Sequence, residues 1–272
     1  MKLYAIPFFA ALAFASLLHT NAYALKPSKG YEAVPDTMKL PFEKNVITTT
    51  DDVHLKSWTF LPSNGDKHAT VVMAYADAGN MSWWLTQATI LSQFGYTVVM
   101  FDYRGFGESD DFTVNKDMLY YNEFVTDLTA AIEFARKKYP KNKTGVWSFS
   151  MGTIIATLSY EKAKPDFIIG DGFVTSPAKI KAFYAPKENI LLPANANTYE
   201  TKLEAIKVPM LIFSGKQDVV TTDADIQKLK KSKPAIKVVN FDGEHLHGFE
   251  KLSKTFYGSE YIAAIDKFLG KK

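Results

Sequence analysis

Short, unbroken runs of hydrophobic residues alternate with stretches of helical spacing from residue 69 to the C-terminus. Strands that are buried on both faces have such unbroken apolar runs, whereas half-buried strands alternate apolar and polar residues. The pattern therefore predicts an α/β fold, in which a mostly parallel, twisted sheet has helices on both faces. The predicted strands are residues 69–75, 96–103, 145–149, 167–174, 210–214 and 236–241, and the predicted helices are residues 82–94, 119–139, the stretch after Ser150, and residues 260–269.

Two other parts of the chain depart from this rhythm. Residues 45–50 and 53–61 pair β-forming residues with polar ones around a turn, which is typical of a half-buried hairpin, and residues 26–44 before them predict an irregular lead-in. Between about residues 176 and 207, Lys, Pro and Asn are mixed with apolar residues. A small lid above the strand ends and a long surface connection with a short helix both fit this stretch.

The first 24 residues have the pattern of a secretory signal peptide. Lys2 provides a positive start, residues 6–18 are almost entirely apolar, and Ala22-Tyr23-Ala24 is a cleavage site of the A-x-A type. An uncleaved membrane anchor is the alternative, but this apolar run is shorter than the roughly 20 residues that span a bilayer. We therefore expect cleavage after Ala24, no membrane span after it, and a single secreted or periplasmic domain over residues 25–272.

Composition narrows the possible classes of function. The chain has 272 residues, of which 47% are hydrophobic, and this is enough for a sizeable core. The net charge is only +3 and the lysines are scattered, so we expect no nucleic-acid partner. The sequence contains no cysteine, which excludes disulfides and a cysteine nucleophile. Because it also contains no phosphate loop, dinucleotide fingerprint or metal-ligand cluster, we expect no cofactor and no metal.

A candidate nucleophile stands where a predicted strand meets a predicted helix. Ser150 follows the apolar run 145–149 within a small-x-Ser-x-Gly turn, which has Ser148 at the first small position and Gly152 at the last. A serine hydroxyl is a poor nucleophile unless the turn presents it to a base and an oxyanion site. In open α/β sheets such partners lie at the carboxyl ends of the strands.

The candidate partners of Ser150 are a carboxylate and a histidine that follow later strands. Asp218 comes after the strand at 210–214, and its rival is Asp171, at the end of the preceding strand. His245 comes after the last strand, next to a glycine turn, and its rival is His247. The histidine would take the serine proton, and the carboxylate would hold the imidazole in the required tautomer.

The order of Ser150, Asp218 and His245 is that of an α/β-hydrolase triad, and from about Thr48 to the C-terminus the chain resembles the α/β-hydrolase superfamily of serine hydrolases. Residues 101–109 carry a D-x-R-G-x-G-x-S sequence that is similar to the segment after the fourth strand in that superfamily. The resemblance implies an α/β-hydrolase fold with a small lid insertion at about 176–207. We expect Asp102 and Arg104 of this segment to form a buried pair that braces the loop.

An oxyanion hole needs two backbone N–H groups that point at the developing negative charge. Met151, directly after the candidate nucleophile, is expected to supply one of them. The second is assigned by the resemblance, because residues 75–80 are similar to the H-G-N-A-G-N sequence of the family. Tyr75-Ala76-Asp77 replaces His-Gly-Asn there, so Asp77 is the implied donor.

Large apolar residues near these positions suggest a hydrophobic substrate. Trp83, Trp84 and Phe149 are the candidate substrate-binding residues, although the tryptophans could equally pack their helix against the sheet. The sequence therefore predicts a serine hydrolase that cleaves small or hydrophobic carboxylic esters through an acyl-enzyme. Cleavage of amides, peptides or thioesters by the same residues is one alternative, and a non-catalytic protein that binds a hydrophobic ligand is another.

Overall fold

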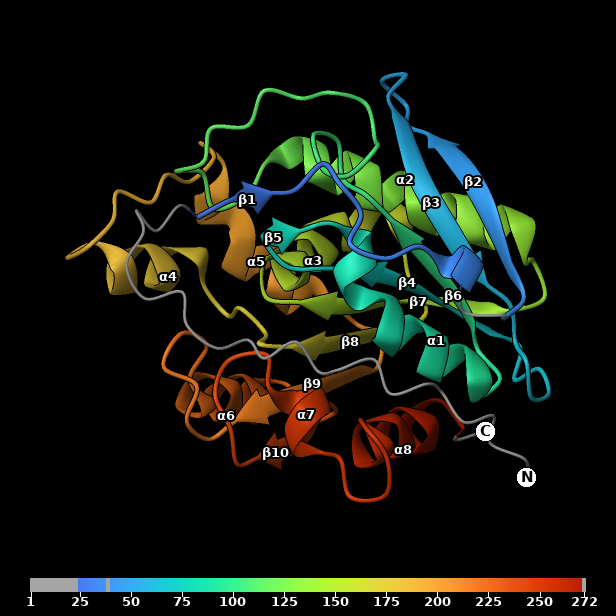
Figure 1. The fold of residues 1–272 in the computed structure, drawn as a ribbon. Helices are drawn as coiled ribbons and strands as arrows, with labels where there is room; N and C mark the ends of the chain where they lie inside the picture. The colour runs from blue at the N-terminus through green and yellow to red at the C-terminus, as the bar shows by residue number, and fades with distance from the viewer. Residues whose placement is uncertain (1–23, 38–39, 271–272) are drawn as a thin grey trace.

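A single sheet of eight strands forms the centre of the molecule (Figure 1). The computed structural model describes residues 24–37 and 40–270, so the predicted signal peptide lies outside the described residues except for Ala24. The strand order is β10-β9-β8-β7-β4-β6-β3-β2, in which β3 pairs in an antiparallel way with both β2 and β6 and the other neighbours pair in parallel. The strands are β2 (Phe42–Thr48), β3 (His54–Phe60), β4 (Ala69–Ala74), β6 (Thr97–Phe101), β7 (Lys143–Phe149), β8 (Ile168–Asp171), β9 (Met210–Gly215) and β10 (Lys237–Phe241).

Helices cover both faces of this sheet, which confirms the predicted layers. In Figure 1, α1 and α8 lie on one face and α2 and α3 lie on the other. No helix in the described part of the chain is long and apolar enough to cross a membrane. The α-helices are α1 (Leu85–Gln93), α2 (Asn122–Lys138), α3 (Met151–Ala163), α4 (Pro177–Tyr184), α5 (Tyr199–Ala205), α6 (Asp223–Ser232), α7 (Gly248–Lys251) and α8 (Ser259–Leu269).

The central strands are apolar because helices cover both of their faces. Every residue of β4 and β6 is buried. On one face Tyr261 of α8 stacks on Phe213 of β9, with ring centroids 3.5 Å apart, and Trp147 of β7 is fully buried beside them. Burial of such large rings removes much apolar surface from water, and it fixes the sheet on which the candidate site is built.

Several element boundaries differ from the predicted ones for local reasons. The strand predicted at 167–174 ends at Asp171 because Gly172 turns the chain with a positive φ of 60°. The lead-in is less irregular than predicted: β1 (Lys26–Pro27) pairs in parallel with β5 (Ala78–Gly79). The sequence analysis also missed α6, which begins at Thr222, whose side chain caps the helix by accepting from the N–H of Asp225.

The segment predicted as a lid or long connection contains both helix and irregular backbone. Residues 176–207 include α4, a short 3-10 helix (Ala196–Thr198) and α5. Leu191 within it pairs with the loop before α2, since its N–H donates to Asp117 and its carbonyl accepts from Leu119. This segment is therefore bonded to another loop near its middle, at Leu191, in addition to its chain connections at both ends.

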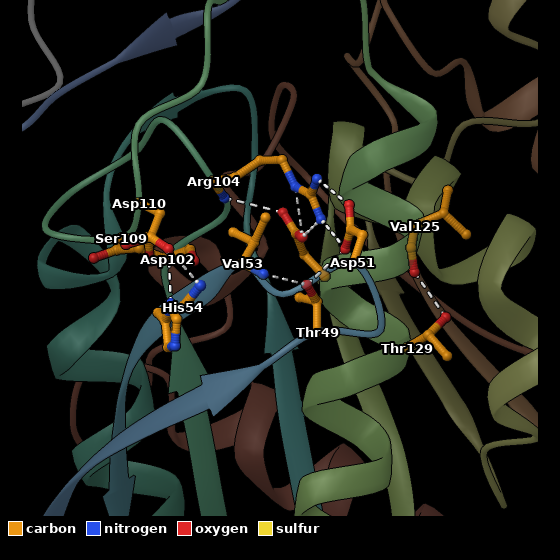
Figure 2. Close-up of polar contacts among 11 residues, drawn as sticks. Thr49, Asp51, Val53, His54, Asp102, Arg104, Ser109, Asp110, Val125 and Thr129 are labelled. Carbon is orange, nitrogen blue, oxygen red and sulfur yellow. Dashed lines mark hydrogen bonds and ion pairs between the residues drawn. The ribbon is translucent and has the colours of Figure 1, made fainter.

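The expected pair between Asp102 and Arg104 is wrong. The Arg104 guanidinium donates to Asp127 of α2, with Nε 2.8 Å from Oδ1, and to Asp51 of the β2–β3 turn, with Nη1 2.6 Å from Oδ2 (Figure 2). Asp102 instead accepts hydrogen bonds from Tyr31, Tyr75 and the N–H of Met81. The two residues therefore brace different parts of the molecule: Arg104 holds α2 and the β2–β3 turn, and Asp102 holds Tyr31 and the loop after β4.

Removing one carboxylate of the Arg104 cluster should destabilise the fold. Asp127→Ala leaves the buried guanidinium of Arg104 with only the half-exposed Asp51, and an uncompensated buried charge costs about 3–5 kcal/mol. Glu161→Ala, which breaks the exposed pair with Lys202, should cost less than about 1 kcal/mol. Urea unfolding of both variants measures the difference, and equal losses would contradict the assignment.

Candidate active site

The turn between β7 and α3 holds Ser150 in a strained conformation. Its φ of 47° and ψ of −113° are values that residues with a side chain rarely adopt. A Cβ on Gly152 would lie 1.9 Å from the carbonyl oxygen of Ala74, so only glycine allows α3 to approach β4 here. The buried Ser148 hydroxyl donates to the carbonyl of Ile169 at 2.8 Å, which gives the serine at this small position a structural role.

The structure brings Ser150, His245 and Asp218 into one hydrogen-bonded chain. Nε2 of His245 is 2.9 Å from Oγ of Ser150, and Nδ1 of His245 is 2.8 Å from Oδ2 of Asp218. The rival histidine, His247, stands immediately before α7. This is the arrangement in which an imidazole can take a serine proton while a carboxylate holds the opposite ring nitrogen.

Asp218 is held as an ionised hydrogen-bond acceptor. Its Oδ1 accepts from the N–H groups of Val220 and Thr221, and its Oδ2 accepts from the Thr221 hydroxyl at 2.6 Å. Burial alone would raise the pKa of Asp218, but the hydrogen bond and charge of His245, together with the bonds from Thr221, hold that pKa below its usual value. Thr221 was not predicted from the sequence, although a turn aspartate often accepts from the backbone N–H two residues on, as Asp218 does from Val220.

The rival carboxylate, Asp171, lies buried beside the site. Its backbone carbonyl accepts from the N–H of Ser150 at 3.0 Å, and the next residue, Gly172, lies against the ring of His245. Its Oδ1 is buried without a hydrogen-bond partner. Burial raises the pKa of Asp171 to about 7, although the charge of His245 and a hydrogen bond from Tyr261 act in the opposite direction.

The two expected oxyanion donors follow two neighbouring strands, Met151 after β7 and Asp77 after β4. Met151 is the first residue of α3, so its N–H has no carbonyl partner within the helix. Asp77 lies in the loop after β4, half-buried, and burial raises the pKa of its carboxyl while the charges of His245 and Lys26 lower it.

The predicted substrate-binding residues are divided between the surface and the interior. Trp83 is 38% exposed and lies over Gly79, next to the loop of Asp77. Trp84 packs against Phe149 with the rings tilted by 33° and their centroids 4.2 Å apart, and Phe149 is almost fully buried. Their contact with a substrate remains a prediction, and the packing of Trp84 fits the alternative that it fastens its helix to the sheet.

Tyr184, at the end of α4, is a site residue that the sequence analysis missed. Burial raises its pKa, and the charges of Asp77, Glu188 and Asp218 raise it further, so its hydroxyl lies near enough to these carboxylates to sense their charge. Next to it in the chain is an open hollow of about 370 Å³, lined by Lys181, Ala185, Pro186, Lys187, Glu188, Asn189 and Ile190. Among the residues that the structure describes, no three His, Asp or Glu side chains are grouped as metal ligands would be.

Known proteins with the same fold are serine hydrolases and esterases. The family model described as "Serine aminopeptidase, S33" matches residues 65–187. The esterase Pf2001 of Pyrococcus furiosus superposes with a TM-score of 0.69 at 19% identity, over 90% of this chain and 97% of its own. The protein XC6422 of Xanthomonas campestris, described as an α/β serine hydrolase without a lid, superposes with a TM-score of 0.61 at 15% identity, over 90% and 96%. The chain therefore has the α/β-hydrolase fold.

The match to solved structures fixes the fold, and residues 65–187 resemble a family of serine hydrolases. A curated relative along most of the chain is the uncharacterized protein YfhR of Salmonella typhi. It is 25% identical over 272 residues, which cover 93% of this chain and 89% of that protein. These similar proteins do not identify a substrate for this chain.

The raised pKa of Asp171 should make the stability of this α/β hydrolase depend on pH. The folded chain holds the Asp171 proton up to about pH 7, whereas the unfolded chain releases it near pH 3.8, so this group lowers stability as the pH rises between those values. Asp171→Asn removes the penalty and should raise the melting temperature more at pH 8 than at pH 4. The matched control is Asp242→Asn, which changes an exposed carboxyl. A gain that is the same at both pH values would contradict this account.

Proposed function

We propose that this protein hydrolyses carboxylic esters through an acyl-enzyme, with Ser150 as the nucleophile, His245 as general base and acid, and Asp218 as the group that orients His245. The observation that carries the proposal is the continuous relay of hydrogen bonds, 2.9 Å from Ser150 to His245 and 2.8 Å from His245 to Asp218. The strained backbone at Ser150 supports it as well, because such strain persists mainly where function requires it.

The reaction follows from these contacts. His245 takes the Ser150 proton as Oγ attacks the ester carbonyl, and the N–H groups of Met151 and Asp77 stabilise the resulting oxyanion. The imidazolium then donates its proton to the departing alcohol, which leaves the acyl group on Ser150. Water, activated by the same imidazole, attacks the acyl-enzyme and returns Ser150 to its starting state.

We infer that the enzyme recognises its substrate mainly through a small or partly apolar acyl group. The exposed face of Trp83 and the nearby side chain of Tyr184 support this, since both lie close to the loop of Asp77. Cleavage of peptides or amides is the second candidate, because the matching family model describes serine aminopeptidases. A purely ligand-binding role is less compatible with the complete relay, since binding alone needs no strained serine.

Covalent labelling and ester hydrolysis test the proposed function together. The wild-type protein should react with a fluorophosphonate probe and hydrolyse short and medium p-nitrophenyl esters, whereas Ser150→Ala should do neither, since removal of the nucleophile costs about a millionfold in kcat. Ser232→Ala, at the exposed end of α6, is the matched control and should behave like the wild type. No labelling of the wild type, or equal hydrolysis by Ser150→Ala, would rule out the proposal.

We also propose that the chain is exported and cleaved after Ala24, on the basis of the apolar run and the Ala22-Tyr23-Ala24 site. Expression of the full chain in a bacterial host should then yield protein outside the cytoplasm with Leu25 as its first residue. N-terminal sequencing and intact mass measurement of the fractions check this. Protein that keeps residues 1–24 in the cytoplasmic fraction would contradict it.

A further inference from the structure

The segment that follows Ala24 is bonded directly to the loop that carries Asp77. We call residues 25–32 the N-terminal strap. The N–H of Lys26 donates to the carbonyl of Asp77 at 2.9 Å, and the N–H of Ser28 donates to the carbonyl of Gly79 at 2.9 Å, which makes β1 a short parallel partner of β5 (Figure 1).

The strap is itself fixed on several sides. Leu25 is fully buried, and its N–H donates to the carbonyl of Lys116 at 2.9 Å. The carbonyl of Ser28 accepts from the N–H of Gly107 at 2.8 Å and from the buried side chain of Asn80 at 3.2 Å. The strap therefore joins the loop of Asp77 to two other loops, and these contacts keep it from being a freely moving tail.

Asp102 links the strap to the loop of Asp77 through its carboxylate. Its Oδ2 accepts from the Tyr31 hydroxyl of the strap at 2.7 Å. Its Oδ1 accepts from the N–H of Met81 at 2.7 Å and from the Tyr75 hydroxyl at 3.1 Å. Tyr75 and Met81 stand on either side of Asp77 in the chain, so one carboxylate fastens both ends of the loop and the strap to the end of β6.

The N–H of Asp77 is useful in catalysis only if its direction is fixed before the oxyanion forms. At one end the loop is held by β4, whose Ala74 pairs with Ser148 of β7. On the other side of the Asp77 N–H, the carbonyl of the same residue is held by the N–H of Lys26. With the backbone held both before and after it, the Asp77 N–H has little freedom to turn.

We infer that the strap is a positioning element of the oxyanion hole, and that the N–H of Lys26 acts through the Asp77 carbonyl to aim the Asp77 N–H at the substrate. This inference rests on the proposed ester hydrolysis. It assigns to residues 25–32 a role in transition-state stabilisation, and none in binding the substrate in its ground state. Loss of the Lys26 N–H should therefore lower kcat and leave KM nearly unchanged.

Two substitutions at Lys26 isolate this N–H group. Lys26→Pro removes both the ammonium group and the backbone N–H, whereas Lys26→Ala removes only the ammonium group. With a p-nitrophenyl ester, we expect kcat of Lys26→Pro to fall at least about tenfold below that of Lys26→Ala, within the hundred- to thousandfold that loss of a whole oxyanion donor costs. KM should agree within about twofold, and the affinity for a trifluoromethyl ketone inhibitor should fall by the same factor as kcat.

The outcomes separate this inference from the proposed function. Equal kcat values for Lys26→Pro and Lys26→Ala, or a change confined to KM, would overturn the positioning role while the ester hydrolysis stands. A wild-type protein and a Lys26→Ala variant that are both inactive would instead contradict the proposed function, and the positioning role with it.

Ser28→Pro and Ser28→Ala form a second pair, in which the lost N–H is the one that donates to Gly79. They should show the same split between kcat and KM as the pair at Lys26. Melting temperatures report whether each variant is folded. Unfolding of both proline variants would show that the strap supports the whole fold, and this would also overturn the inference.

Discussion

The backbone at Ser150, held at a φ of 47° between β7 and α3, is the constraint on which the rest of the site depends. Its N–H is bonded to the carbonyl of Asp171, and α3 approaches β4 so closely that only glycine fits at position 152. The buried strands on both sides keep this turn from relaxing, because any other conformation would open the packed core around β7. The apolar sheet therefore stores the strain that presents the serine hydroxyl to His245.

Burial acts differently on the carboxyl groups around this turn, and their hydrogen bonds explain the difference. Asp218 accepts three bonds besides the one with His245, and its pKa lies below its usual value. Asp171 is buried with one oxygen unpaired, and burial raises its pKa to about 7. Burial also raises the pKa of Asp102 to about 6, even though three donors hold it. Of these three carboxyl groups, Asp218 is the one that combines a lowered pKa with a direct bond to the imidazole of His245, as the orienting group requires.

Sequence patterns predicted the sheet, most of its helices and the three residues of the relay, because each of these leaves a local signal. An apolar run marks a buried strand, and Ser150, Asp218 and His245 each follow such a run. Two kinds of feature left no such signal. The partners of Arg104 and Asp102 lie far away in the sequence, and no local pattern indicates them. The two residues were therefore expected to pair with each other. The pairing of β1 with β5 involves two residues on each side, too few for any periodicity.

The central claim is that Ser150 attacks a carbonyl whose oxygen is received by the N–H groups of Met151 and Asp77. A crystal structure of the protein after reaction with a fluorophosphonate tests it most directly, since the bound phosphonyl oxygen takes the place of the oxyanion. We predict a covalent bond from phosphorus to Oγ of Ser150, with that oxygen about 2.7–3.1 Å from both backbone nitrogens. A label on another residue, or a phosphonyl oxygen that faces away from Met151 and Asp77, would contradict the account.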